Sequence, residues 1–215
     1  MVTLVRIPLF PLHLVLFPGM LLSLHIFEPR YRRMIRQCID EKQEFGIILQ
    51  RNEKLSRVGC AARVEEVFKK YEDGRFDIEV RGQERFRVRR LFEDHAHLEA
   101  EVEFFSDEGQ NEEKRRIESM ARKASQGLLG LDAMGDSLLN SEMLLELQPE
   151  ALSLMICGTG LFNLEEKQDL LESIDTAGRL ENAIVRIGER LRRRSAEKKI
   201  EDLLGAPIDF KLMLN

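Results

Sequence analysis

Side chains that could support catalysis are scattered along the chain and form no recognisable motif. The four histidines are His13, His25, His95 and His97, and none belongs to an H-E-x-x-H sequence or lies near a pair of cysteines. A zinc site therefore has little support, because zinc ligands usually come in such spacings. No G-x-S-x-G sequence is present either, although a nucleophile and its base can be far apart in sequence. We expect no catalytic centre, no metal and no cofactor.

Two short patterns resemble fragments of ligand-binding motifs. His95-Ala96-His97 could place two imidazoles on one strand face and bind a metal weakly, but a polar bend before the next strand is the simpler interpretation. Gly158-Thr159-Gly160 follows one helical pattern and opens another, so we interpret it as a bend and not as a dinucleotide loop. No glycine is followed by Lys and then Ser or Thr, as a phosphate-binding loop requires.

Two groups of arginines could bind a polyanion. The first gives one predicted strand a basic outer face: Arg85, Arg87, Arg89 and Arg90. The second lies on the last predicted helix: Arg192, Arg193 and Arg194. Three acidic residues alternate along the next predicted strand and could pair with the first group across the sheet: Glu99, Glu101 and Glu103. No aromatic residue is interleaved on the basic face and the formal net charge is −5, so we favour paired, solvated arginines over nucleic-acid binding.

Composition is that of a globular protein of one large domain or two small ones, with 215 residues of which 43% are hydrophobic. No apolar run reaches the roughly 20 residues that span a bilayer. The apolar N-terminal stretch is interrupted by prolines and does not resemble a secretory signal. Cys38, Cys60 and Cys157 are odd in number and far apart, which suits free thiols in a reducing compartment. We expect a cytoplasmic protein with no membrane partner.

Prolines divide the N-terminal region into short elements. Pro8, Pro11 and Pro18 lack an N–H, so the apolar runs between them, including residues 14–17, are predicted to be short strands, edge strands or crossings. Residues 20–27 alternate, which predicts a strand with one face towards the core: Leu22, Leu24 and Ile26. Pro29 suits the first position of a helix. That helix has one apolar stripe: Tyr31, Met34, Ile35, Cys38 and Ile39.

Period-two patterns continue to about residue 106. Residues 45–49, 59–71, 76–80, 86–88 and 98–104 read as strands, with a hairpin turn at Glu72-Asp73-Gly74 and a break at Gly82. Several closely spaced strands with one inserted helix predict a curled mixed sheet or open barrel.

The period becomes helical after residue 106. One stripe comprises Ile117, Met120, Ala121, Ala124 and Leu128, and residues 130–140 read as a loop. Asn163 with Glu166 predicts a capping box. Asp175 and Thr176 open a last long helix whose apolar face holds Leu180, Ile184, Ile187 and Leu191. We therefore predict an α+β protein, with a β domain at residues 1–106 and a helical lobe at residues 107–215.

Three blocks of sequence resemble the Lon substrate-binding domain, the N-terminal module of the ATP-dependent protease Lon. The first is residues 7–35, which ends in the step Phe27-Glu28-Pro29-Arg30-Tyr31. The second is residues 59–88, with the step Gly82-Gln83-Glu84-Arg85-Phe86. The third is residues 165–184, where a Lys-Gln pair precedes Leu-Leu-Glu and a later Arg-Leu. The resemblance extends from about residue 5 to residue 195, is weakest over residues 106–150, and implies a PUA-like β domain.

The resemblance implies a module that recognises unfolded or damaged polypeptide and has no ATPase or protease activity of its own. Its partners would be client polypeptides and a separate protease or ATPase, and it could form a homodimer. An RNA-binding or scaffolding role is the alternative, because some PUA-like folds bind RNA.

Seven residues are candidates for peptide binding. Four border a turn and could form exposed apolar surface, or could be core: Leu14, Leu16, Phe17 and Met20. Three belong to the family's most recognisable step: Glu28, Arg30 and Tyr31. The alternative for these three is structural, since a carboxylate and an arginine can hold a strand-to-helix junction by charge-assisted hydrogen bonds.

The tail from Pro207 to Leu214 is apolar and loosely alternating. We expect it to add a strand to a sheet edge, on its own chain or on a second subunit.

Overall fold

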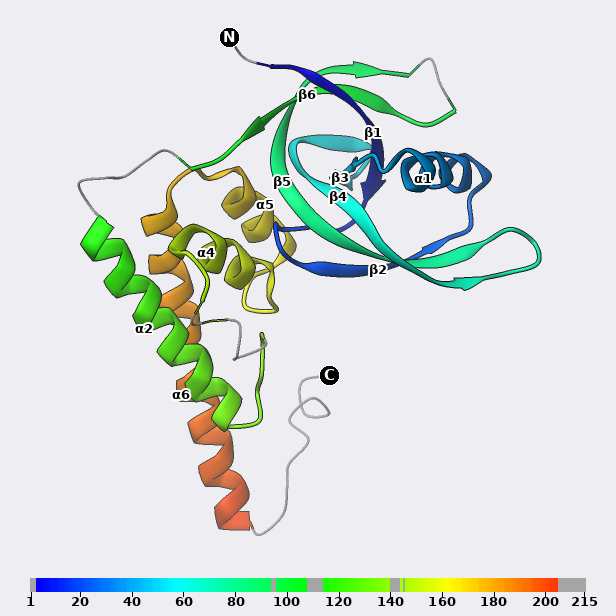
Figure 1. Cartoon of the computed structure of the whole chain (residues 1–215). Coiled ribbons are helices and arrows are strands. Elements are labelled where there is room, and N and C mark those ends of the chain that lie inside the picture. The colour runs from blue at the N-terminus through cyan, green and yellow to red at the C-terminus, as the bar shows by residue number, and fades with distance from the viewer. Residues whose placement is uncertain (1–2, 94–95, 108–113, 140–143, 145, 205–215) are drawn as a thin grey trace.

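Strands occupy the first half of the chain and helices the second (Figure 1). The computed structural model describes residues 3–93, 96–107, 114–139, 144 and 146–204. His95 and the 207–214 tail lie outside these residues. The first half contains β1 (Val5–Leu12), β2 (Leu21–Ile26), α1 (Pro29–Glu41), β3 (Phe45–Arg51), β4 (Lys54–Lys70), β5 (Phe76–Phe92) and β6 (Glu99–Phe105). The second half contains α2 (Lys114–Ala133), α4 (Pro149–Gly158), α5 (Leu164–Glu172) and α6 (Thr176–Leu204).

The strands form a mixed six-stranded sheet in the order β2-β5-β4-β3-β1-β6. An additional pairing of β5 with β6 closes the five strands β5, β4, β3, β1 and β6 into a ring. β1 and β3 are parallel, whereas the other pairs are antiparallel. β2 pairs with the first part of β5 and β6 with the second part. The predicted α+β class, with a curled mixed sheet and one inserted helix, is confirmed.

β1 shows how two prolines can lie within a sheet. Residues Val5 to Pro8 pair with β6, and residues Leu9 to Leu12 pair with β3 on the other side. The pairing changes sides at Leu9, whose N–H donates to the Leu98 carbonyl at 2.8 Å while the residue also pairs with Gly46. Pro8 pairs with β6 and Pro11 with β3, so each proline lies where one side is unpaired and a missing N–H costs least. Residues 14–17, between β1 and β2, cross over the sheet without forming a strand.

The break predicted at Gly82 is an irregularity and not the end of a strand, because β5 continues through it while its register with β4 shifts between Gly82 and Arg85. Gly82 is where the 17–20 segment crosses β5. The Gly82 N–H donates to the Met20 carbonyl at 2.9 Å, and the Gly82 carbonyl accepts from the Gly19 N–H at 2.9 Å. A Cβ at position 82 would lie 2.2 Å from the Phe17 carbonyl oxygen. Glycine is required here by the close approach of two backbones.

α1 begins at Pro29, as predicted, and packs on the sheet through its apolar stripe. Tyr31, Met34, Ile35 and Cys38 are buried, and the Tyr31 ring lies 4.3 Å from that of Phe10 on β1. The outer face of β2 also follows the prediction, since Ser23 and His25 are exposed while Ile26 is buried. A separate cluster fills the ring: Ile7, Leu9, Ile48, Ala61, Phe86, Ala100 and Val102.

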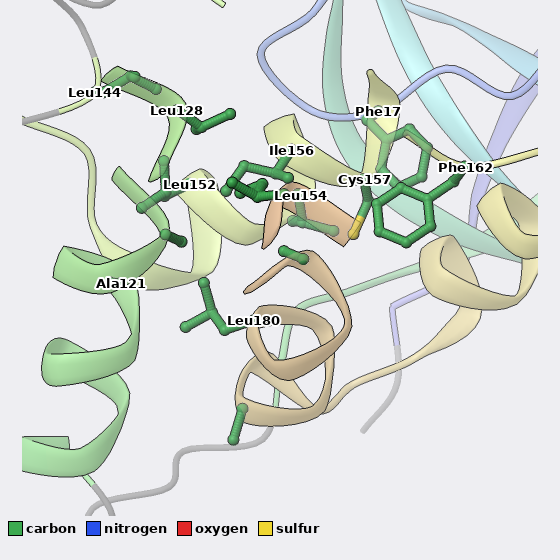
Figure 2. Packing of buried hydrophobic residues seen from close by; sticks show 14 of the residues in the cluster. Phe17, Ala121, Leu128, Leu144, Leu152, Leu154, Ile156, Cys157, Phe162 and Leu180 are labelled. Carbon is green, nitrogen blue, oxygen red and sulfur yellow. The ribbon is translucent and has the colours of Figure 1, made fainter. Parts of the chain in front are cut away.

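The helices share one hydrophobic cluster, to which Phe17 and Val58 of the β region also belong. Figure 2 shows Phe17 beside Phe162 and Cys157, with Leu152 and Leu180 further into the helices. α2 continues to Ala133, so the predicted loop at 130–140 begins later than expected, because Leu131 is fully buried in this cluster. The capping box is confirmed. The Glu166 N–H donates to the Asn163 side chain, and the Asn163 N–H donates to the Glu166 carboxylate, both at 2.9 Å.

Candidate functional site

The 14–20 segment lies between the ring of strands and the helices. Leu16 and Phe17 are 4% and 0% exposed, whereas Leu14 and Met20 are partly buried. Met20 packs so closely on α4 that Gly158 has no room for a Cβ beside the Met20 sulfur. Burial favours a structural role for Leu16 and Phe17, and leaves Leu14 and Met20 as the members of this group that a ligand could reach. Peptide contact by these residues stays a prediction.

Glu28, Arg30 and Tyr31 lie together where β2 leads into α1. The Arg30 Nε donates to Glu28 Oε2 at 3.0 Å, and the guanidinium lies 4.6 Å from the centre of the Tyr31 ring. Burial raises the pKa of Tyr31, whose side chain packs beneath the helix. The Glu28–Arg30 ion pair at the start of α1 is compatible with the structural alternative, and both that role and ligand contact by the three residues stay predictions.

Arg85 is the residue whose predicted environment differs most from the structure. The alternating pattern predicts it on a basic outer face, yet it is 2% exposed because the helices cover that side of β5. Its guanidinium donates to the carbonyls of Leu171 and Ser173 at 3.1 and 2.6 Å and to the Asp107 carboxylate at 2.5 Å. The prediction of a solvated Arg85 is therefore wrong.

Asp107 also binds Arg179 of α6, which is 1% exposed. The Arg179 guanidinium donates to Asp107 Oδ1 at 3.0 Å, to the Ser173 carbonyl at 2.8 Å and to the Ser153 hydroxyl at 2.9 Å. The Thr176 hydroxyl donates to the second Asp107 oxygen. We call the group Arg85, Asp107 and Arg179 the junction cluster. It joins β5, the segment after β6, and α6.

Burial and neighbouring charges shift the pKa values of Asp107 and Arg85 in the junction cluster. Burial alone would raise the pKa of Asp107, but hydrogen bonds from Arg179 and Thr176 and the charges of Arg179 and Arg85 outweigh it and hold the pKa below its ordinary value. Burial lowers the pKa of Arg85, and the Asp107 charge opposes that shift. The Asp107 carboxylate accepts from Arg85, Arg179 and Thr176, so the cluster is suited to holding the two halves of the chain together.

A second polar contact crosses the same junction. The buried Gln168 of α5 donates from Nε2 to the Val58 carbonyl of β4 at 3.1 Å. Gly82, Arg85, Gln168 and Arg179 thus all lie at the contact between strands and helices. These are residues of the sequence blocks quoted above, and their spacing alone did not indicate that they meet.

Three of the other arginines are paired with carboxylates as predicted, whereas Arg87 lies against an aromatic ring. Arg89 forms an ion pair with Glu103 across β5 and β6. The Arg87 guanidinium lies 4.5 Å from the centre of the Phe105 ring. On α6, Arg193 and Arg194 form ion pairs with Glu197 at 2.8 and 3.0 Å.

A groove lies between α1 and the β4–β5 hairpin, on the surface of the β region. Its depression, with a volume of about 410 Å³, has an apolar floor of Ile39, Val67, Tyr71 and Phe76. Arg36, Lys70 and Arg75 stand at its rim. A second depression shares Ile39 and Val67 and continues towards Lys42, and a third shares Arg36 and Gly74 and continues towards Pro29. We call these three adjoining depressions the hairpin groove.

Contacts within the hairpin fix the shape of this groove. The Arg36 guanidinium donates to the Gly74 carbonyl at 3.0 Å and lies 5.7 Å from the Phe76 ring centre. The Tyr71 ring has the Lys69 ammonium 4.5 Å and the Arg75 guanidinium 5.0 Å from its centre. The Tyr71 hydroxyl donates to Asp77 at 2.9 Å. α1 and the hairpin are therefore held in register without a ligand.

Three further observations concern metal binding, the ionisation of an exposed carboxyl, and membrane insertion. Within the described ranges, no three His, Cys, Asp or Glu side chains are grouped so as to hold a metal ion. His25 contacts Asp77 on the outer face of the sheet, and hydrogen bonds from His25 and Tyr71 lower the pKa of that carboxyl. Among the described residues, no helix is both long enough and apolar enough to cross a bilayer.

Comparison with known proteins identifies the family. A family model described as the ATP-dependent protease La (LON) substrate-binding domain matches residues 6–187. Lon protease 2 of Syntrophobacter fumaroxidans is 25% identical over 92% of this chain and 26% of the relative's length. Lon protease 1 of Bdellovibrio bacteriovorus is 27% identical, with the same coverage. The chain thus spans about a quarter of the length of these curated relatives.

Solved structures agree with this assignment. A Lon N-terminal domain protein from Xanthomonas campestris has a TM-score of 0.61 and 27% identity, covering 82% of this chain and 95% of that one. The N-terminal domain of the Mycobacterium avium complex Lon protease has a TM-score of 0.66 and 20% identity, covering 85% and 98%. The second likeness supports the fold alone. The sequence match over residues 6–187 shows that this chain belongs to the Lon substrate-binding domain family.

Proposed function

We propose that this chain recognises polypeptide clients and catalyses no reaction itself. Family membership supports a substrate-recognition module, because the matched model describes a substrate-binding domain. The observation that carries the proposal is the hairpin groove, whose apolar floor is formed by Ile39, Val67, Tyr71 and Phe76. Pockets that combine an apolar floor with a few polar groups are the usual places for binding.

The groove suits a side chain from an unfolded or damaged polypeptide. Folded proteins bury most large apolar side chains, whereas unfolded chains expose them. Burying one such side chain contributes about 1.5–3 kcal/mol, so a single contact is weak and reversible. A module of this kind would deliver clients to a separate protease or ATPase, as an adaptor in quality control.

A binding experiment with an unfolded model protein tests the proposal. Reduced, carboxymethylated α-lactalbumin carrying a fluorophore would be titrated with the purified chain, and anisotropy would report binding. We expect binding to this form and none to native α-lactalbumin, with little dependence on salt. Val67→Asp, in the groove floor, should weaken binding at least tenfold, while Val185→Asp, on the exposed face of α6, should leave it unchanged.

The same titration addresses the alternative of RNA binding. Affinity for RNA that falls steeply with salt, together with no affinity for unfolded α-lactalbumin, would contradict the proposal and favour the alternative. A melting curve for each variant separates loss of binding from loss of fold.

A further inference from the structure

We propose that the hairpin groove selects client segments in which an apolar side chain is flanked by acidic residues on one side. This inference rests on the proposed function and names the class of client. Three observations support it: the groove has a local surplus of positive charge, most of its cations form no close ion pair within the protein, and the surplus lies at one end of the groove.

The hairpin end of the groove is positively charged on a negatively charged protein. The two depressions at this end are lined by five cationic residues: Arg32, Arg33, Arg36, Lys70 and Arg75. Three acidic residues line them as well: Asp40, Glu72 and Asp73. The local surplus is two positive charges, whereas the whole chain has a formal net charge of −5. A concentration of charge opposite in sign to the rest of the molecule attracts an oppositely charged ligand.

Most of these cations form no close ion pair with a carboxylate, although the pKa of the nearby Asp73 is lowered by hydrogen bonds from Arg75 and also by the Arg32 charge. Arg32 donates to the Asp73 backbone carbonyl at 2.6 Å and Arg36 donates to that of Gly74 at 3.0 Å, and carbonyls carry no net charge. Among the described residues, no carboxylate lies within 4.0 Å of the charged nitrogens of Arg32, Arg33, Arg36 or Lys70. Arg75 is the exception, because it forms an ion pair with Asp73 at 2.7 Å.

The backbone contacts also prepare the arginines for a ligand. Arg32 and Arg36 are each fixed by a hydrogen bond to the hairpin, and a guanidinium has five N–H donors. Donors therefore remain for a ligand carboxylate, in charge-assisted hydrogen bonds that are about twice as strong as neutral ones. Fixing these side chains before binding reduces the entropy lost when a ligand is bound.

The opposite end of the groove has no such surplus. The depression beyond Ile39 and Val67 is lined by two cationic residues, Lys42 and Arg63, and two acidic ones, Glu65 and Glu66. Arg63 is paired with Glu44 at 2.7 Å and Glu65 with Arg81 at 3.2 Å. A client would therefore place its apolar side chain over the floor and its acidic residues towards Gly74.

Polypeptide fits this groove better than nucleic acid. The floor between the cations is made of Ile39 and Val67 together with Tyr71 and Phe76, and aliphatic side chains are poor partners for stacked bases. The net charge of −5 repels a long polyanion, while a short acidic segment meets mainly the local surplus.

Labelled twelve-residue peptides provide the test. One has a central Phe-Leu pair with three acidic residues on one side, the second replaces these with lysines, and the third keeps the acidic residues but replaces Phe-Leu with Ser-Ser. A labelled oligouridine of the same length is the fourth probe. We expect the first peptide to bind at least tenfold more tightly than each of the others.

Charge reversal at exposed positions tests whether the hairpin end of the groove is the part that prefers acidic segments. Arg33→Glu with Lys70→Glu should reverse the preference between the first two peptides, because both side chains are exposed and line the hairpin end. Arg192→Glu with Lys198→Glu makes the same change of charge on exposed positions of α6 and should leave it unaltered.

The outcomes separate this inference from the proposed function. Equal binding of the acidic and basic apolar peptides would overturn the charge preference and leave polypeptide recognition standing. Equal binding of the Ser-Ser peptide or of oligouridine would show a site for polyanions and overturn the inference. Failure of all peptides to bind, together with failure of unfolded α-lactalbumin, would overturn both.

Discussion

The Arg85 guanidinium in β5 donates a 3.1 Å hydrogen bond to the Leu171 carbonyl at the end of α5. This bond is buried and links residues 86 positions apart. It satisfies a carbonyl that α5 cannot satisfy internally, since the last carbonyls of a helix have no partner within it. Together with the contacts of Asp107 and Arg179, this bond satisfies buried polar groups of the strands with partners from the helices.

Asp107→Asn should destabilise the protein by about 3–5 kcal/mol, the usual result of removing one partner from a buried ion cluster. The substitution leaves the buried Arg179 guanidinium without its carboxylate partner, and leaves the buried Arg85 with only the partly exposed Glu150 at 3.5 Å. Urea unfolding followed by circular dichroism measures the change. Asp202→Asn, at an exposed position on α6, is the matched control and should shift the free energy by less than about 0.5 kcal/mol. An equal effect of the two substitutions would show that the cluster contributes nothing.

The contribution of Asp107 to stability should depend on pH. Its pKa is below the ordinary value in the folded protein, so its stabilising effect is complete above the unfolded-state pKa of about 3.9 and is lost as the pH falls through the folded-state pKa. The difference in free energy of unfolding between the wild type and Asp107→Asn should therefore be constant from about pH 7 to about pH 5 and should narrow below about pH 4. Urea unfolding of both proteins at four or five pH values would measure this difference. A difference that grows on acidification would mean the shift has the opposite sign.

Gly82→Ala should cost about 1–3 kcal/mol, the usual range for overpacking. The added Cβ would meet the Phe17 carbonyl oxygen at 2.2 Å, and this neighbour is backbone that cannot rotate away. Gly160→Ala is the control, because no heavy atom of the described residues is recorded within 4 Å of a Cβ there. Thermal unfolding of the two variants should show a clear loss for the first and little change for the second. If both variants melt with the wild type, the 17–20 crossing adapts more freely than the structure indicates.

Local patterns predicted the elements well, and the reasons are visible in single residues. Pro29 starts α1 and Asn163 caps α5 because each acts on its nearest neighbours in sequence. The alternation of β2 and β6 follows from one face of each strand being buried. Such signals need no knowledge of the rest of the chain.

Arg85 and Gly82 show that local sequence patterns do not predict contacts between residues far apart in the chain. The alternation correctly places Arg85 outside the ring, opposite the buried Phe86, but the covering of that face by α5 and α6 comes from residues 80 to 100 positions later. The role of Gly82 depends on a crossing by residues some 60 positions earlier. The hairpin groove was missed for the same reason, since α1 and the hairpin meet only in the fold.

The three cysteines should be unreactive in the native protein. Cys38, Cys60 and Cys157 are 3%, 0% and 0% exposed, and burial raises the pKa of Cys38 to about 11 and that of Cys157 to about 12. The thiolate is the reactive form, so at pH 8 it is a negligible fraction of each thiol. Titration with a chromogenic disulfide should modify no thiol within minutes in buffer and all three in concentrated urea. Rapid reaction of one thiol in buffer would reveal local opening around that residue.

Asn163→Ala should destabilise the protein by about 0.5–2 kcal/mol through loss of an N-cap. The Asn163 side chain accepts from the Glu166 N–H, and the Glu166 carboxylate accepts in return from the Asn163 N–H, so one substitution breaks half of a reciprocal pair. Asn163→Asp keeps an acceptor at the same place and should retain most of the stability, which makes it the matched control. Glu166 also contacts Arg186 of α6, so part of the loss should appear as looser packing of α5 on α6. Hydrogen exchange of the α5 amides would detect this, and unchanged protection in Asn163→Ala would mean that packing alone holds the start of α5.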